Sequence, residues 1–194
     1  MRAILGVEYC KQNGIDIWSL GEHNDFLFDT QFKIDFFQQW AGVLCVMDYD
    51  TYKIVPDSCK KYRTFIVYSE DLNLVSIETD DEYSIKIVHN LTELFTVLNA
   101  YQSIVDKTYE ITTICGGKNI YEALLPYCEF LYTINNNVSK CYNFIYHTIN
   151  VPVYDTMSDT WKNITSQVVT DVYTNEIFML HRYKNLELKE IPIY

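Results

Sequence analysis

A pair of glycines between a strand-like run and a helix-like run is the stretch of this sequence best suited to chemistry. Tyr109–Cys115 is rich in β-forming residues and predicts a buried strand, whereas Lys118–Leu125 has helical apolar spacing and stops at Pro126. Gly116 and Gly117 lie between them. Because a helix N-terminus presents free backbone N–H groups, this arrangement can hold a phosphate. The alternative is that the glycines only let the helix and strand pack closely, since complete nucleotide-loop patterns are absent.

Histidine and cysteine spacing argues against metal and disulfide chemistry. The histidines are scattered without the spacing of metal ligands: His23, His89, His147 and His181. The cysteines include no CxxC pair: Cys10, Cys45, Cys59, Cys115, Cys128 and Cys141. Several of them fall in apolar, strand-like runs. We therefore expect no metal, and we expect reduced core cysteines in an intracellular, cytoplasmic protein.

Composition limits the class of protein and its partners. The 194 residues with 48% hydrophobic content predict a single globular domain over residues 1–194. No apolar run reaches the ~20 residues of a membrane span, and Met1–Glu8 is typical of a first strand rather than a signal peptide. The net charge of −11 argues against nucleic acid as a partner. The excess of Tyr, Phe, Ile and Asn suggests an AT-rich genome, such as that of a phage or another virus, which would place the protein in the host cytoplasm or the virion.

Alternating strand and helix patterns surround the glycine pair. The predicted helices, besides the one after the glycines, are Phe28–Trp40, which is amphipathic, and Leu91–Tyr101, which follows an Asn90–Glu93 capping box. A turn is expected at Asn13-Gly14. The other predicted strands are Met1–Tyr9, Val43–Met47, Thr64–Ser69, Leu74–Asp81, Tyr83–Val88, Glu129–Asn135, Ser166–Tyr173 and Ile177–Tyr183.

The segment ICGGKNIYEALLPY, residues 114–127, and the EFLYTIN that follows it resemble the central motif of the dihydrofolate reductase family. The resemblance runs in order through nearly the whole chain and is most specific at residues 109–133. It implies an α/β fold with a mixed, mainly parallel sheet flanked by helices and closed by an antiparallel C-terminal hairpin. It also implies a cis peptide at Gly116-Gly117 facing the cofactor NADPH, with Tyr121 near the reacting centre.

The same resemblance assigns further contacts. By position, Lys118 and Thr51 would join the two glycines in binding the cofactor. Phe32 and Phe36 would lie against the substrate, and Arg63 would grip the glutamate tail of folate, a bidentate role that suits arginine. The alternative for Arg63 is an ordinary surface arginine at the start of a strand.

The family's proton donor is altered in this sequence. Reduction of a pterin needs a proton. The family supplies it from one acid on the helix that corresponds to Phe28–Trp40, four residues before a phenylalanine. If that phenylalanine is Phe36, the acid position falls on Phe32, whose ring carries no proton. Asp29 or Asp35 could act only after a shift of register, and Asp29 is the candidate. The family's active-site threonine falls on Ile134, and Thr133 would point to the other face of the sheet.

The family's phosphate site is altered as well. In the family, a Gly-Arg-x-Thr motif after the strand that corresponds to Val43–Met47 opens a helix that holds the cofactor phosphates. In this sequence, Asp48 and Tyr49 replace the glycine and the arginine of that motif. Asp48, Asp50 and Glu70 bring negative charge to that edge, which disfavours phosphate. We therefore predict a catalytically degenerate homologue used as a binding or structural module, with a protein partner or as a homo-oligomer, and with no cofactor. The alternative is an active NADPH-dependent reductase of dihydrofolate or a related pterin that supports nucleotide synthesis.

Overall fold

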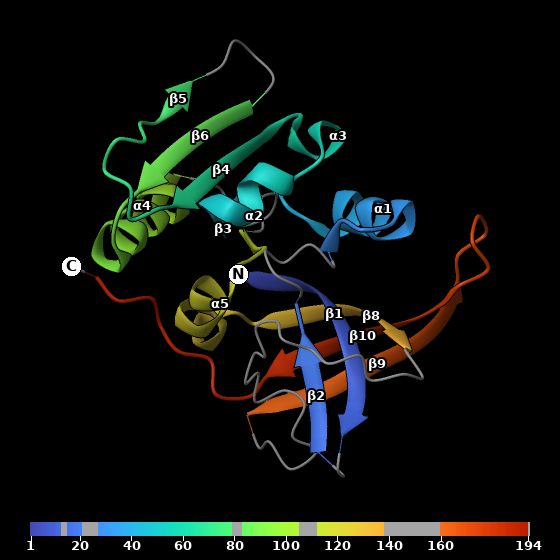
Figure 1. The fold of residues 1–194 in the computed structure, drawn as a ribbon. Helices are drawn as coiled ribbons and strands as arrows, with labels where there is room; N and C mark the ends of the chain where they lie inside the picture. The colour runs from blue at the N-terminus through green and yellow to red at the C-terminus, as the bar shows by residue number, and fades with distance from the viewer. Residues whose placement is uncertain (13–14, 21–26, 79–82, 105–111, 138–159, 194) are drawn as a thin grey trace.

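The computed structural model describes residues 1–12, 15–20, 27–78, 83–104, 112–137 and 160–193 (Figure 1). In these residues, ten strands form one sheet in the order β5-β6-β4-β3-β7-β1-β8-β10-β9, with β2 beside β1. The strands are β1 (Arg2–Gln12), β2 (Ile15–Ser19), β3 (Leu44–Asp48), β4 (Arg63–Tyr68), β5 (Ile77–Glu78), β6 (Tyr83–Val88), β7 (Thr113–Ile114), β8 (Phe130–Asn137), β9 (Trp161–Thr170) and β10 (Ile177–Asn185). The helices are α1 (Gln31–Trp40), α2 (Tyr49–Ile54), α3 (Asp57–Lys60), α4 (Leu91–Ile104), α5 (Lys118–Leu124) and the 3-10 turn η2 (Leu125–Tyr127).

The centre of the sheet is parallel and its ends are antiparallel. Strand β1 pairs in parallel with β7 and β8, β3 with β4 and β7, and β4 with β6. The β9–β10 hairpin joins β8 in antiparallel fashion. Parallel neighbours need crossover connections, which helices such as α4 and α5 supply between strands. The predicted mixed, mainly parallel sheet with an antiparallel C-terminal hairpin is therefore confirmed.

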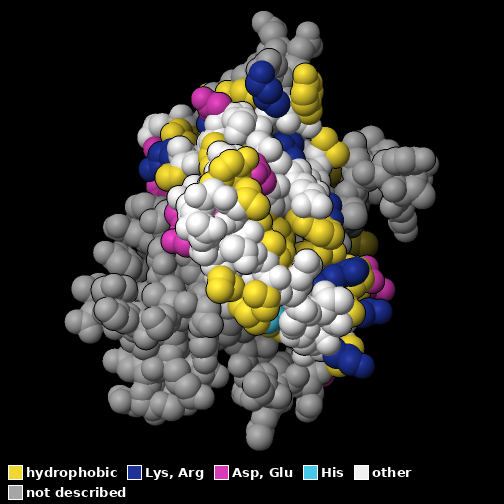
Figure 2. Space-filling model, turned by 90° about the vertical axis from the view of Figure 1, so that its right-hand side faces the viewer, with side chains coloured by type: hydrophobic (Ala, Val, Ile, Leu, Met, Phe, Trp, Pro, Cys, Tyr) yellow, Lys and Arg dark blue, Asp and Glu magenta, His cyan; other side chains and the backbone are white. Residues whose placement is uncertain are grey.

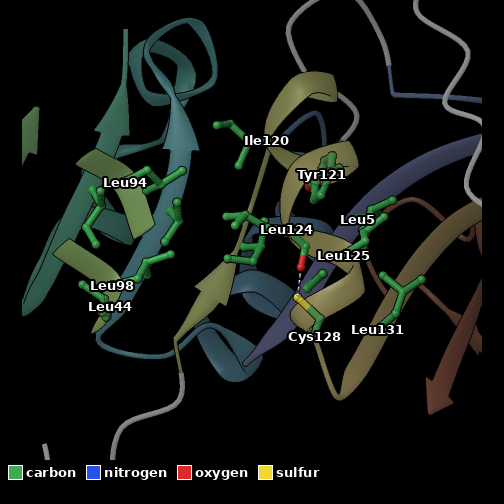
Figure 3. Close-up of a cluster of buried hydrophobic side chains, with 14 of the residues drawn as sticks. Leu5, Leu44, Leu94, Leu98, Ile120, Tyr121, Leu124, Leu125, Cys128 and Leu131 are labelled. Carbon is green, nitrogen blue, oxygen red and sulfur yellow. Dashed lines mark hydrogen bonds between the residues drawn. The ribbon is translucent and has the colours of Figure 1, made fainter. Parts of the chain in front are cut away.

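Helices cover both faces of the sheet because strand residues alternate in direction. On one face, α4 and α5 pack on strand residues such as Leu5, Leu44 and Leu131 (Figure 3). On the other face, Phe36 and Phe37 of α1 pack against a second set of strand residues. The cysteines whose side chains the structure describes are buried and unoxidised, as expected: Cys45, Cys59, Cys115 and Cys128.

Several predicted boundaries were wrong. Helix α1 begins at Gln31 and not at Phe28, because the Thr30 hydroxyl caps it by accepting from the N–H of Lys33 at 3.3 Å. The predicted strand Leu74–Asp81 is reduced, in its described part, to Ile77–Glu78. The predicted strand Ser166–Tyr173 begins earlier, at Trp161, and ends at Thr170.

Other local predictions hold. Asn90 caps α4 by accepting from the N–H of Glu93 at 2.8 Å, and Pro126 lies in the turn that ends α5. The chain beyond β10 returns to η2, where the N–H of Lys189 donates to the carbonyl of Pro126 at 3.0 Å, and to α4, where the Asn99 side-chain amide donates to the carbonyl of Pro192 at 2.8 Å. Asn13-Gly14 and residues 109–111 of the predicted central strand lie outside the described residues. Among those residues, no helix has the length and apolar character to cross a membrane.

Candidate functional site

The glycine pair lies where the parallel strands β3 and β7 end. The N–H of Cys115 donates to the carbonyl of Val46 at 2.8 Å, and the N–H of Asp48 donates to the carbonyl of Gly116 at 3.1 Å. The Gly116–Gly117 peptide is cis, as expected, and Gly116 has a φ of 143°, which favours glycine. In α/β sheets, the carboxyl ends of parallel strands are where ligands bind. The structure thus places the glycine pair at the edge where the sequence predicts a site.

Tyr121 joins α5 to the central strand behind the glycines. Its side chain is fully buried and its hydroxyl donates to the carbonyl of Ile4 in β1 at 2.6 Å. Its N–H donates to the carbonyl of Gly117 at 3.0 Å, one turn back along α5. Figure 3 shows the tyrosine among the apolar side chains between α5 and the sheet. Tyr121 therefore lies beside the glycine pair, anchored to the strand that runs through the middle of the sheet.

Asp48 fills the space between the N-termini of two helices. One carboxylate oxygen, Oδ1, accepts from the N–H of Thr51 at 2.8 Å and so caps α2. The other, Oδ2, lies where a Cβ on Gly117 would project, and Asp48 Cγ is 2.9 Å from that point. Gly117 is the N-cap of α5 and makes no side-chain cap bond of its own. Since helix N-termini favour negative charge, this carboxylate acts as an internal anion at both.

The remaining predicted cofactor residues flank that carboxylate. Thr51 is buried in the first turn of α2. Lys118 is the first residue of α5, is partly exposed, and lies 3.8 Å from Glu122 through Nζ and Oε1. Asp50 also lies in the first turn of α2, where it pairs with Lys53 at 2.6 Å. The structure therefore brings together the four residues predicted to bind the cofactor: Thr51, Gly116, Gly117 and Lys118. It also places there two of the three carboxylates predicted to repel the cofactor phosphates, Asp48 and Asp50.

The substrate side of the predicted site is packed with aromatic rings. Phe32 of α1 stacks on Phe178 of β10, with ring centroids 4.8 Å apart. Phe36 is buried in the same cluster, and Ile134 of β8 belongs to it as well. Phe32 and Ile134 therefore lie on the α1 face of the sheet, and for Ile134 this is the face that the alternation along its strand predicts. Thr133 is buried on the opposite face, the face of its neighbour Leu131, and its hydroxyl has no partner among the described residues.

An ion pair at the start of α1, buried at its Lys33 end, was missed by the sequence reasoning. Lys33 is fully buried, and its Nζ lies 2.9 Å from Asp29 Oδ2 and 5.8 Å from the centre of the Phe178 ring. Asp29 precedes the helix and its side chain is 31% exposed. The signal for the pair was the Asp29–Lys33 spacing of four residues within an apolar stripe. Asp35, the other carboxylate considered, is exposed and accepts from Gln31 at 2.7 Å.

Arg63 is held by backbone carbonyls. Its Nε donates to Gly42 at 3.2 Å, and its two terminal nitrogens donate to Cys59 at 2.9 Å and Gln38 at 3.2 Å. The guanidinium also lies 5.6 Å from the centre of the Phe37 ring. These contacts tie β4 to the C-terminal half of α1 and to α3. Three of the five N–H groups of Arg63 are thereby used within the protein.

Nucleophilic and metal chemistry find no support at this edge. Burial raises the pKa of the Cys115 thiol, next to the glycine pair, well above its ordinary value, and the neighbouring Cys45 adds to the shift. A buried thiol with a raised pKa stays protonated and unreactive. In the part of the chain that the structure describes, no group of three or more His, Cys, Asp and Glu side chains is arranged to hold a metal ion.

Comparison with known proteins identifies the fold. No protein-family model and no curated protein matches the sequence. Among solved structures, the chain is similar to a dihydrofolate reductase from Enterococcus faecalis complexed with NADP(H) and RAB-propyl. The similarity covers 96% of each chain, with 16% sequence identity and a TM-score of 0.61. At that identity the match shows a dihydrofolate-reductase-like fold, and the fold alone.

Proposed function

We propose that this chain is a divergent dihydrofolate reductase homologue that no longer carries out the reduction and serves as a binding or structural module. The observation that carries the proposal is the Asp48 carboxylate, which caps α2 and lies against Gly117. The fold implies NADPH as cofactor, with its phosphates near these helix N-termini. A carboxylate built into the same place does not fit a second anion.

The negative charge at this edge determines how strongly the phosphates of NADPH are repelled. Two unit negative charges 4 Å apart repel by about 1 kcal/mol in bulk water and by about 4 kcal/mol near a protein surface. Asp50 adds a second carboxylate in the first turn of α2, although its pairing with Lys53 reduces its effect. Lys118 is the cation nearest in sequence to the glycines, and it is shared with Glu122. The residues present therefore disfavour NADPH.

The proton supply supports the same reading. Phe32, at the acid's position, stacks on Phe178 and carries no proton. Asp29 lies before the helix and its carboxylate is bound to the Lys33 ammonium. Ile134 offers no hydroxyl on the α1 face for a proton relay. Because a positioned acid contributes ~10²–10⁴-fold to the rate, its loss compounds the loss of cofactor binding.

A titration of the purified chain with NADPH at physiological salt tests the proposal. We expect a dissociation constant weaker than about 100 µM, which corresponds to about −5.5 kcal/mol. Asp48→Asn keeps an N-cap side chain but removes the charge, and should tighten binding at least about tenfold. Asp57→Asn is the matched control, because Asp57 is an exposed carboxylate on α3 that pairs with Lys60. Micromolar binding by the wild-type chain would overturn the proposal.

An active reductase is the second candidate, and Tyr121 is the observation that favours it. Its hydroxyl bond to Ile4 and its position beside the glycines keep the framework that the resemblance associates with turnover. The two readings differ in dihydrofolate-dependent oxidation of NADPH, which we expect to stay at background. If the wild-type chain turns over, the Asp29→Asn variant decides whether Asp29 supplies the proton.

A further inference from the structure

One end of the sheet is a long strand with an open edge. Strand β9 ends the strand order, so only its β10 side is paired among the described residues. Its side chains from Lys162 to Val168 are all exposed, so none of the described residues covers this stretch on either face. Ten residues make an edge of about 33 Å. The strand at the opposite end of the sheet, β5, has two residues in the described part of the chain, and a very short strand is one way that proteins blunt an edge.

The composition of β9 suits pairing with another strand. Its sequence, WKNITSQVVT, contains no Pro and no carboxylate, and Lys162 is its only charge. The β-bulge between β9 and β10 leaves Ile164 without an opposite residue, but Thr165–Thr170 keep an unbroken register. Edge strands usually carry charge, Pro or bulges along their length to prevent pairing. The six-residue segment Thr165–Thr170 lacks all three.

Apolar side chains accompany this edge. Val168 of β9 lies opposite Met179 of β10. Ile177, two residues before Met179 on β10, lies on the same face of the sheet. Val168 is 62% exposed and Ile177 is 55% exposed. Figure 2 views the side toward which the β9–β10 hairpin projects in Figure 1; uncharged side chains fill its middle and charged ones lie mostly toward its rim.

The turn that ends this hairpin is pre-ordered. The buried Asp171 carboxylate accepts from the N–H of Tyr173 and the hydroxyl of Thr174, both at 2.9 Å. The N–H of Asn175 donates to the carbonyl of Asp171 at 2.9 Å. These bonds hold the ends of β9 and β10 in place. A strand fixed in this way loses little conformational freedom when another strand pairs with it.

We propose that β9 pairs in antiparallel fashion with β9 of a second copy, which forms a two-fold symmetric dimer. Under a two-fold axis every contact is made twice by the same residues, so the strand must be complementary to itself. With the axis inside Thr165–Thr170, Lys162 lies opposite the far end of the partner strand and away from its own copy. Like charges therefore do not meet across the axis.

Charge distribution favours a second copy over a foreign basic partner. The chain has a net charge of −11, so a basic protein would be drawn to its carboxylates. The same net charge makes two copies repel at long range, but strand β9 has no carboxylate, so the local repulsion between two copies is small there. This surface is separate from the glycine pair, and the dimer stands whether or not the chain binds NADPH.

Sedimentation equilibrium of the full chain between about 10 and 500 µM tests the dimer. The wild type should approach twice the 22.9 kDa of one chain. The double variant Gln167→Lys/Val168→Lys places like charges across the axis and should weaken the dimer at least about tenfold. The matched control is Leu72→Lys/Val75→Lys, which adds the same charge at exposed apolar positions before β5, where the two residues are 77% and 71% exposed.

Amide hydrogen exchange of the wild type tests the interface without relying on a variant that could fail to fold. In the wild type, outward amides of Thr165–Thr170 should gain protection as the protein concentration rises, while the rest of the sheet exchanges unchanged. A wild type that stays monomeric at every concentration refutes the second copy as occupant and leaves the edge to a strand of another protein. A dimer that tolerates both lysines on β9 refutes β9 as the interface.

Discussion

The ion pair between Asp29 and Lys33 gives the sharpest test of how α1 is built. Lys33 is fully buried, and its ammonium lies 2.9 Å from the Asp29 carboxylate. Asp29→Asn removes the negative charge while keeping the shape of the side chain. Lys33→Met removes the positive charge and leaves an apolar side chain of similar length in a cluster that contains Phe36 and Phe178. The two single variants and the double variant complete a thermodynamic cycle.

Burial decides the expected magnitudes. Removing one partner of a buried pair costs about 3–5 kcal/mol, because the other charge remains buried. Since Asp29 is 31% exposed, water already screens part of the interaction, and we expect Asp29→Asn to cost about 2 kcal/mol. Replacing a buried charge by an apolar side chain of similar size is often neutral or stabilising, so Lys33→Met should cost less than about 0.5 kcal/mol. The double variant should match Lys33→Met, because the penalty of Asp29→Asn requires the ammonium.

Urea unfolding followed by tryptophan fluorescence measures these differences. With a slope of about 2–3 kcal/mol per molar urea, Asp29→Asn should lower the midpoint by roughly 0.7–1 M at an unchanged slope. The reasoning fails if Lys33→Met destabilises the protein more than Asp29→Asn does. That result would mean that the ammonium makes contacts worth more than the cost of burying it.

Three further predictions concern the site and the hairpin. Tyr121→Phe removes the hydroxyl that bonds the carbonyl of Ile4 and should lower the free energy of unfolding by about 1–2 kcal/mol, measured by urea titration. Gly117→Ala brings a Cβ onto the Asp48 carboxylate and should cost about 1–3 kcal/mol, and a double-mutant cycle with Asp48→Ala should show coupling, since the added methyl then no longer meets that carboxylate. Burial lowers the pKa of His181 below its ordinary 6.5, so the unfolded chain takes up the proton at a higher pH than the folded chain. The free energy of unfolding should therefore fall as the pH drops through about 6.5 and level off below the folded-state pKa. In thermal melts, the His181→Gln variant should show a smaller fall over the same pH range.

Local sequence patterns determined the framework around the glycine pair. The β-forming run ending at Cys115, the helical spacing after Gly117 and the stop at Pro126 depend on neighbours in the chain. The type of each was predicted correctly, although the described strand, Thr113–Ile114, is shorter than the predicted run. The same holds for the Asn90 cap of α4. Alternation along β8 also placed Ile134 and Thr133 on opposite faces, because strand periodicity needs no knowledge of the partner strand.

Two element boundaries were mispredicted because apolar or strand-forming side chains continue past the residue at which the element begins or ends. Thr30 starts α1 by capping Lys33, but Phe28 continues the apolar pattern because it packs on Phe37 before the helix begins. Periodicity records burial, and burial does not stop at a cap. The turn after Thr170 ends β9 because Asp171 bonds the following backbone, although Val172 and Tyr173 have strand-like side chains.

The partners of the charged groups were decided by the tertiary structure. The family resemblance predicted that Asp48 replaces a glycine at a phosphate site, but only the approach of β3 to α5 brings its carboxylate against Gly117. The sequence showed Arg63 at a strand start, but only the meeting of α1, α3 and β4 supplies the three carbonyls that hold its guanidinium. Electrostatic interactions depend on distance and on exclusion of water, and both are set by residues far apart in the chain.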